Sequence, residues 1–265
     1  MLIDSIRLAF TTFSKIPVGR PAWSGKNMRY LLCAFPLVGV VIGGVQLSWL
    51  RLADAFALSD LLRGTVAALL PALLTGGIHL DGFCDTCDAL ASHAAPERRR
   101  EILKDPHTGA FAVIGVVIYM SAYLGFASSL PRTLAAELFF CVGFVLSRAV
   151  SGFLVYALPP AAEGMAKSTR DAAQSGTERR VAALFEMWFG LCAVAIFFIA
   201  APLGGGVTAG ISALLAALVP AGIVRFQALR RFGGMSGDLA GWYLQMAELM
   251  TLAAVALVSA FAAHI

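Results

Sequence analysis

Charged side chains are scarce in this sequence of 265 residues. Only 14% of the residues are Asp, Glu, Lys or Arg, whereas 59% are hydrophobic. A soluble domain usually contains about 25% charged residues. The balance therefore excludes an ordinary soluble protein and indicates an integral membrane protein.

Cysteine is also rare and is not arranged for disulfide bonds. Cys33, Cys141 and Cys192 fall inside apolar runs, and the total of five is odd. We expect these three side chains to pack as small hydrophobic residues and exclude a disulfide framework. The sequence has no convincing internal repeat and no low-complexity linker, so we expect one membrane-embedded domain over residues 1–265.

The start of the chain has no unbroken apolar run of the kind found in a signal peptide. Asp4, Arg7 and Lys15 interrupt its apolar positions, and no small-residue cleavage site follows. The pattern indicates an amphipathic helix lying in the membrane interface. Residues 1–29 are thus expected to form a cytoplasmic or interfacial segment.

Long apolar stretches make up most of the remaining chain. A membrane-spanning helix needs roughly 20 mostly apolar residues. Seven stretches meet this requirement, and the fold class expected from them is an all-α, polytopic membrane bundle. The expected spans are residues 30–50, 58–78, 110–130, 134–158, 183–204, 207–224 and 242–263.

Lysine and arginine gather in alternate connections between these spans. They are frequent in the N-terminal segment and in segments 79–109, 159–182 and 225–241, and they are rare in the other loops. Because cytoplasmic loops carry the excess of basic residues, we expect a cytoplasmic N-terminus and an outside C-terminus. The three basic segments also hold most of the unusual polar residues, so a site formed there would be open to cytosolic substrates.

The most unusual segment is HLDGFCDTCDAL, residues 79–90, directly after the second expected span. If it is helical, Asp81, Asp85 and Asp88 lie within an arc of about 60° on one face. Like charges on one helix face destabilise the helix, so a cation should sit among them. Oxygen ligands of this kind suit Mg²⁺, which proteins hold with a few carboxylates plus substrate phosphates. The alternative is a merely polar, solvated helix end.

Two other residue types in this segment are potential metal ligands. His79 could bind a metal, although a lone histidine at a membrane interface is commonly a hydrogen-bonded anchor. Cys84 and Cys87 form a CxxC pair, but zinc would require a second pair or suitably spaced histidines. Cys87 also falls on the helix face opposite the aspartates, so we interpret the CxxC spacing as accidental.

The segment RRREILKDPHTGAF, residues 98–111, has the pattern of a helix start. Asp105 is expected to be the N-cap, with Pro106 at the first position of the third span. The same helix end could also bind an anion through its backbone N–H groups, with Lys104 beside it.

Two arginines lie inside expected spans. Arg148 is deep in the fourth span, where an unpaired charge costs several kcal/mol. We therefore expect it to pair with an acid or with a substrate phosphate. Arg63 lies nearer the outer end of the second span, and we expect it to extend to the membrane surface.

The segment RRFGGMSGD, residues 230–238, is a glycine-rich turn that ends in an acid. Glycines allow backbone N–H groups to approach a phosphate closely. Asp238 and Glu248, which is six residues into the last span, could supply the second half of a metal site.

Together these elements resemble one known family. GGIHLDGFCDTCDAL, EILKDPHTGAF, the SR pair ending at Arg148 and RRFGGMSGD followed by Glu248 are similar, in order and spacing, to adenosylcobinamide-GDP ribazoletransferases. The resemblance implies Mg²⁺-dependent transfer of the adenosylcobinamide-phosphate group to α-ribazole or its 5′-phosphate, with release of GMP. It also implies a bacterial inner-membrane enzyme that contacts lipid, does not bind nucleic acid, and forms homo-oligomers or associates with other nucleotide-loop enzymes.

The resemblance implies roles for residues as well. The expected catalytic residues are Asp81, Asp85 and His79. The expected Mg²⁺ ligands are Asp81, Asp85, Asp88, Asp238 and Glu248. The expected substrate-binding residues are Lys104, Asp105, Gly109, Arg148, Arg231, Gly234, Ser236 and Gly237.

The chain departs from the family pattern in two places. Gln245 stands where an acid is common, which leaves Glu248 as the acid of that region. The stretch YALPPAAEGMAKSTR lacks the usual glycine- and aromatic-rich character, which weakens any assignment to Glu163, Gly164 or Lys167.

Two other functions fit part of the pattern. A CDP-alcohol phosphotransferase also binds metals through aspartates, but Ile78 replaces the first aspartate of that motif. A cation- or proton-coupled transporter would also use intramembrane charges, yet here the polar residues gather at one face instead of forming a path across the midplane.

Overall fold

Helices account for all regular elements in the computed structural model, which describes residues 2–19, 21–173, 175–200 and 206–262. No β-strand occurs within these ranges; there is only an isolated bridge between Pro160 and Met235. The expected all-α class is therefore confirmed.

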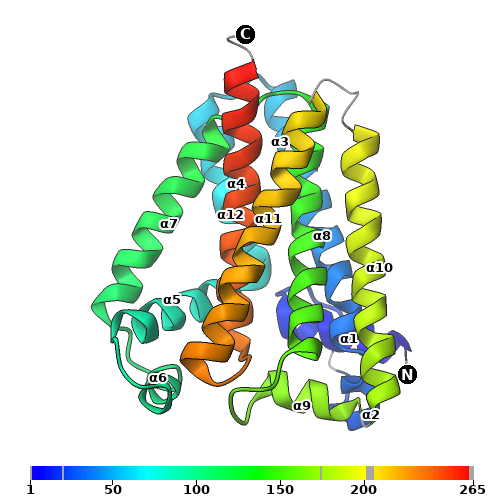
Figure 1. Ribbon diagram of the computed structural model, residues 1–265. Coiled ribbons are helices and arrows are strands. Elements are labelled where there is room, and N and C mark those ends of the chain that lie inside the picture. The colour runs from blue at the N-terminus through cyan, green and yellow to red at the C-terminus, as the bar shows by residue number, and fades with distance from the viewer. Residues whose placement is uncertain (1, 20, 174, 201–205, 263–265) are drawn as a thin grey trace.

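Six helices are long and apolar enough to cross a membrane, and they run alongside one another in Figure 1. They are α3 (Phe35–Ala55), α7 (Ala110–Ser128), α8 (Leu134–Ala157), α10 (Gly176–Ala200), α11 (Gly206–Gln227) and α12 (Gly237–Ala262). Each overlaps an expected span, with ends that differ by up to seven residues, and the chain is a polytopic membrane protein. The ends of two expected spans, at residues 201–204 and 263, lie outside the described residues.

The second expected span is shorter than predicted. Helix α4 covers only Asp60–Thr75, about 24 Å at 1.5 Å per residue, less than the roughly 30 Å of a bilayer core. Gly76 and Gly77 then adopt φ angles of +66° and +79°, which residues with a side chain rarely adopt. The chain bends there by 95° into α5 (Ile78–Ala91). Helix α5 therefore crosses the end of the bundle, as Figure 1 shows, and only α4 and α5 together are long and apolar enough to count as a seventh span.

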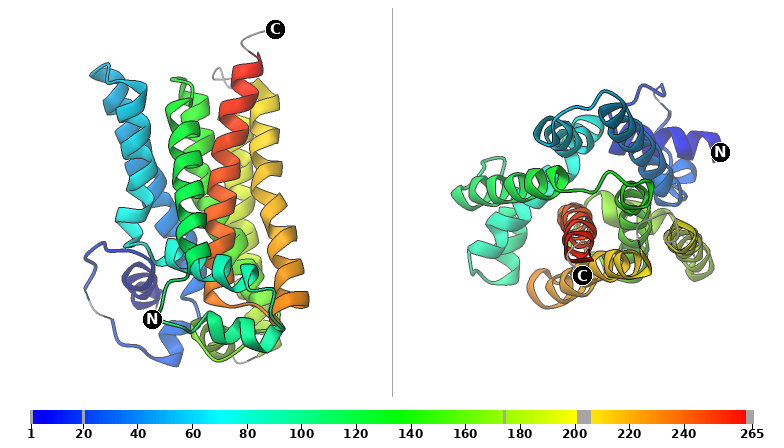
Figure 2. Two further views of the ribbon diagram at one scale, coloured as in Figure 1. Left: turned by 90° about the vertical axis from the view of Figure 1, so that its left-hand side faces the viewer. Right: turned by 90° about the horizontal axis from the view of Figure 1, so that it is seen from above.

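Helix α8 is the centre of the bundle. It contacts α3, α10, α11 and α12, and the view from above in Figure 2 shows these helices around it. Glycines permit its close approach to α3, since a Cβ atom at Gly39 would lie 2.4 Å from the Phe144 carbonyl oxygen. Small residues play this role in many membrane helix pairs.

The short helices gather at the same end of the bundle as α5 (Figures 1 and 2). They are α1 (Leu2–Phe13), α2 (Gly25–Met28), η1 (Leu32–Ala34), α6 (Pro96–Ile102), α9 (Met165–Ala172) and the π-helical turn η3 (Ala228–Phe232). The three segments predicted to share one side of the membrane therefore lie at one end. The N-terminal amphipathic helix also forms, and its Leu8 and Ala9 are fully buried against the bundle.

At the opposite end, Arg63 does not extend to the surface as predicted. Its side chain is buried and forms ion pairs with Glu137, at 2.7 Å, and with Asp54, at 3.0 Å. It also donates a hydrogen bond to the Leu130 carbonyl. The prediction was wrong because the fold places acids of α3 and α8 next to Arg63. These ion pairs neutralise its charge inside the bundle, so the side chain does not need to extend to water.

Candidate active site

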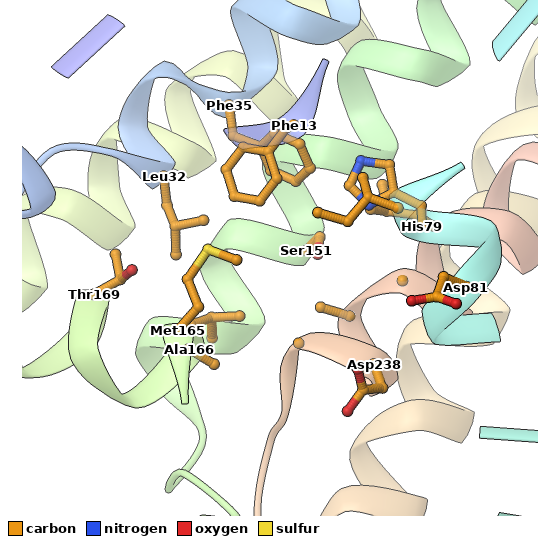
Figure 3. A pocket seen from close by; sticks show the side chains of 16 residues that line it. Phe13, Leu32, Phe35, His79, Asp81, Ser151, Met165, Ala166, Thr169 and Asp238 are labelled. Carbon is orange, nitrogen blue, oxygen red and sulfur yellow. The ribbon is translucent and has the colours of Figure 1, made fainter. Parts of the chain in front are cut away.

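A cavity of about 250 Å³ lies where α5, α8, α9 and α12 meet at the end that holds the short helices. Figure 3 shows its arrangement. Asp81 and Asp238 stand together on one side, whereas Leu32 and Thr169 lie on the other. The cavity therefore has an acidic end and an apolar end.

The acidic end brings together residues 157 positions apart in the chain, from the start of α5 and the first turn of α12. Asp81 is exposed and Asp238 is half-buried. Asp85 is also half-buried, and burial together with the negative charges of Asp81, Asp238 and Asp88 raises its pKa to about 6. These negative charges repel one another, and a bound cation would reduce that repulsion.

Close contact between α5 and α12 fixes this arrangement. A Cβ atom at Gly82 would lie 2.8 Å from the Asp238 Cα, and one at Gly241 would lie 2.8 Å from the His79 carbonyl oxygen. Real side chains do not fit at such distances. The glycine of the HLDG motif thus lets the Asp238 backbone approach Asp81.

The structure gives Asp88 a role that the sequence assigned to Asp105. Both Asp88 carboxylate oxygens accept hydrogen bonds at the start of α7, one from the Gly109 N–H at 2.7 Å and one from the Ala112 N–H at 2.8 Å. Helix α7 begins at Ala110, not at Pro106. The predicted N-cap was wrong because a carboxylate from α5 satisfies these N–H groups instead.

Asp105 remains in the loop before α7. Its carboxylate accepts hydrogen bonds from the backbone N–H of His107, two residues on, at 2.9 Å, and contacts the His107 ring at 2.7 Å. Lys104 and Asp105 are both exposed. Their substrate-binding role stays a prediction, as does the metal role of Asp88.

Glu248 lies apart from the other expected metal ligands. It is ten residues along α12 from Asp238, about 15 Å at the rise of a helix. The side chain is buried and pairs with Arg148, while Ser147 donates a second hydrogen bond. The expectation that Arg148 pairs with an acid is confirmed. Among the described residues, no three His, Cys, Asp or Glu side chains are close enough to form a complete metal site.

His79 is buried at the edge of the cavity. Its ring packs beside those of Phe13 and Phe35, with centroids 6.0 Å and 5.5 Å away. Burial and the positive charge of Arg148 hold the pKa of His79 well below its usual range. The imidazole is therefore neutral, and its Nε2 atom finds no hydrogen-bond partner in the described part of the chain.

The glycine-rich turn at residues 230–238 has a structural role. Met235 donates to the Pro159 carbonyl at 2.7 Å, and a Cβ atom at Gly234 would lie 2.4 Å from the Pro160 carbonyl carbon. Ser236 Oγ accepts a hydrogen bond from the Leu239 N–H and so caps α12. The Arg231 side chain and Gly237 are exposed beside this turn.

The cysteines take no part in this arrangement. All five are free, and the Cys87 sulfur packs against Gly115 of α7. The prediction that they form no disulfide is confirmed.

Sequence reasoning missed the apolar end of the cavity. For the segments that contain Phe13 and Phe35, the sequence predicts only association with the membrane. Met165 and Thr169 belong to α9, which contains no recognisable motif. The amphipathic pattern around Phe13 could have shown that this face is buried, but nothing in the sequence marks Thr169.

The bundle, with two carboxylates at one end of its cavity, defines a polytopic helical membrane protein. A family model described as cobalamin-5-phosphate synthase matches residues 5–256. The chain belongs to the cobalamin-5-phosphate synthase family and is a transferase of cobalamin synthesis.

Relatives named adenosylcobinamide-GDP ribazoletransferase match nearly the whole chain. The protein from Lachnoclostridium phytofermentans is 37% identical over 256 residues, covering 96% of this chain and 93% of its own length. That from Geobacillus kaustophilus is 33% identical, covering 91% and 90%, and that from Sinorhizobium sp is 30% identical, covering 96% of each chain. No solved structure matches the chain.

Proposed function

We propose that this protein transfers the adenosylcobinamide-phosphate group from adenosylcobinamide-GDP to α-ribazole or its 5′-phosphate, with release of GMP. The observation that carries the proposal is the cavity with Asp81 and Asp238 at its mouth, in a chain whose relatives bear the name of this activity. An acceptor hydroxyl would form a bond to the phosphorus that stays with cobinamide. The bond from that phosphorus to the GMP oxygen would break.

The donor set fits Mg²⁺ as the metal. Asp81, Asp85 and Asp238 offer only oxygen atoms, and Mg²⁺ is commonly held by one or two carboxylates together with substrate phosphates. An incomplete protein site is therefore compatible with a metal that binds with its substrate. Bound there, Mg²⁺ would neutralise the pyrophosphate and the departing GMP.

The protein's own contribution would be positioning and proton transfer. Phosphoryl transfer depends mainly on alignment and charge stabilisation, and the contact of α5 with α12 holds Asp81 beside Asp238. The proton of the attacking hydroxyl would go to an aspartate carboxylate or to the neutral imidazole of His79.

The proposal includes an orientation. The cavity would face the cytoplasm of a bacterial cell, with the N-terminus on the same side and the C-terminus outside the inner membrane. The excess of lysine and arginine at this end of the bundle supports it.

The direct test is GMP release by the full chain purified in detergent. It is supplied with Mg²⁺, adenosylcobinamide-GDP and either α-ribazole or its 5′-phosphate. We expect one GMP for each cobalamin product formed, and no GMP when the acceptor is omitted. Absence of GMP release across several lipids and divalent metals, together with ion uptake in liposomes, would reject the transferase in favour of a transporter.

A further inference from the structure

The apolar end of the cavity has the walls of a site for a flat aromatic ring. The rings of Phe13 and Phe35 lie 4.3 Å apart between centroids, and His79 packs beside both. Figure 3 shows these rings on one wall and the Met165 and Ala166 side chains nearby on another. Aromatic walls favour stacking or edge contacts with a planar ligand.

Two buried polar atoms in this region lack partners. His79 is 5% exposed and Thr169 is 1% exposed. The His79 Nε2 and Thr169 Oγ1 atoms make no hydrogen bond to any described residue. Because a buried polar group without a partner costs about 1–3 kcal/mol, both atoms point to a ligand that completes their hydrogen bonds.

The size of the cavity restricts what can enter it. A volume of about 250 Å³ is below the roughly 300–1,000 Å³ of pockets that hold drug-sized ligands. A corrinoid ring with its side chains is far too large, whereas one nucleoside is of suitable size. The large donor must therefore lie mainly outside the cavity.

The two substrates of the proposed reaction carry different bases, guanine and dimethylbenzimidazole, and polarity decides which of them fits the cavity. Guanine presents several donors and acceptors, including N7, O6 and the 2-amino group, and most would remain unpaired against Phe13, Leu32 and Met165. The dimethylbenzimidazole of α-ribazole is mostly apolar and has one ring nitrogen free to accept a hydrogen bond. The Thr169 hydroxyl or the Nε2–H tautomer of the neutral His79 ring could donate that bond.

We propose that this cavity binds the aromatic base of the acceptor nucleoside, with the Phe13, Phe35 and His79 rings along one side of the base and its ribose directed to Asp81 and Asp238. The inference rests on the proposed function and adds the place of the acceptor. A base at the apolar end leaves the sugar at the acidic end, where its hydroxyl meets the phosphorus. Thr169 is then a positioning and specificity residue.

The direct test is a binding measurement with α-ribazole, in which the fluorescence of its base reports binding. It uses the full chain in detergent, without the donor substrate and without a metal. Ala166 lines the cavity and is half-buried, so Ala166→Phe should fill the base site. We expect α-ribazole affinity to fall at least tenfold and the acceptor KM to rise similarly. The donor KM should stay within twofold. Guanosine should not compete.

Two further variants separate binding from general damage. Ser168→Phe adds the same ring at an exposed position of α9 outside the cavity, and its α-ribazole affinity should match that of the unchanged chain. Thr169→Val should weaken α-ribazole binding three- to tenfold, and Thr169→Ser, which keeps the hydroxyl, should restore it.

The outcomes distinguish this inference from the proposed function. If GMP is released normally but Ala166→Phe leaves α-ribazole binding unchanged, or raises the donor KM instead, the base site is wrong while the transferase stands. If the unchanged chain releases no GMP, the proposed function fails. The binding measurement still tests the cavity in that case: loss of α-ribazole binding in Ala166→Phe would show that the cavity recognises this nucleoside, and unchanged binding would show that it does not.

Discussion

At the scale of single residues, the structure divides the acids of this chain by what surrounds them. Asp81, Asp85 and Asp238 lie close enough to repel one another and form no ion pair with a basic side chain of the described residues, whereas Asp88 caps α7 and Glu248 pairs with Arg148. The first three are available for a cation, and the other two already stabilise the fold. Acidic side chains thus have two roles in this protein, and the neighbours of each side chain decide which role it has.

The first prediction concerns two aspartates of α5. Asp81→Asn and Asp85→Asn should each lower GMP release at least 100-fold, because a neutral amide binds Mg²⁺ far more weakly than a carboxylate and does not accept a proton near neutral pH. Addition of Mg²⁺ should raise the melting temperature of the unchanged chain, and this rise should shrink in both variants. Cys87→Ala, on the opposite helix face, should stay active; an inactive but folded Cys87→Ala would revive a role for the thiol.

The second prediction concerns the buried Arg148–Glu248 pair. Removal of one partner leaves an uncompensated charge, at a cost of about 3–5 kcal/mol. Glu248→Gln should therefore lower the melting temperature in detergent clearly, and Arg148→Met combined with Glu248→Leu should recover part of the loss. If Glu248 were instead a metal ligand, Glu248→Gln would weaken Mg²⁺ dependence without loss of stability.

At the scale of elements, the bend between α4 and α5 and the contact of α5 with α12 create the site. Gly76 and Gly77 end α4 before it has crossed a full bilayer core, and their left-handed backbone turns α5 across the end of the bundle. A straight continuation would have carried the aspartates along the membrane normal and away from Asp238. The glycines are therefore as necessary to the site as the acids.

The third prediction tests this contact. Gly82→Ala adds a methyl group that would collide with the Asp238 backbone, so α5 and α12 must separate. We expect a loss of GMP release of tenfold or more, with a smaller effect on the overall helix content measured by circular dichroism. Gly44→Ala is the matched control, since nothing lies within 4 Å of its added atom; equal activity of the two variants would show that the contact is unimportant.

At the scale of the whole molecule, the long helices alternate in direction and place the short helices at one end. That arrangement separates an end with Asp81 and Asp238 from an end with the Arg63, Glu137 and Asp54 cluster. The two groups of charges are at opposite ends of the helix bundle. The first end would hold the reaction and the second would stabilise the bundle.

The fourth prediction concerns the orientation of the protein in the membrane. Thr108→Cys lies in the exposed loop before α7, at the cavity end, and Ser129→Cys lies in the exposed loop after it. A membrane-impermeant maleimide should label Ser129→Cys in intact cells, and Thr108→Cys only after the cells are permeabilised. The reverse pattern would place the cavity on the outside and contradict the expected topology.

The sequence alone determined the membrane class, the positions of six long apolar helices and the residues of the HLDG segment. These follow from local properties: the length of apolar runs, the placement of basic residues and the period of a helix. Resemblance of motifs added the family, which the comparisons then confirmed.

Only the tertiary structure decided which residues meet. Asp238 joins Asp81 because two glycines let α5 and α12 touch, Asp88 caps a helix 21 residues away, and Arg63 finds acids on other helices. Each of these is a contact between segments far apart in the chain. A periodic pattern says which face of a helix is polar, but the partner of that face depends on where the whole bundle brings the next helix.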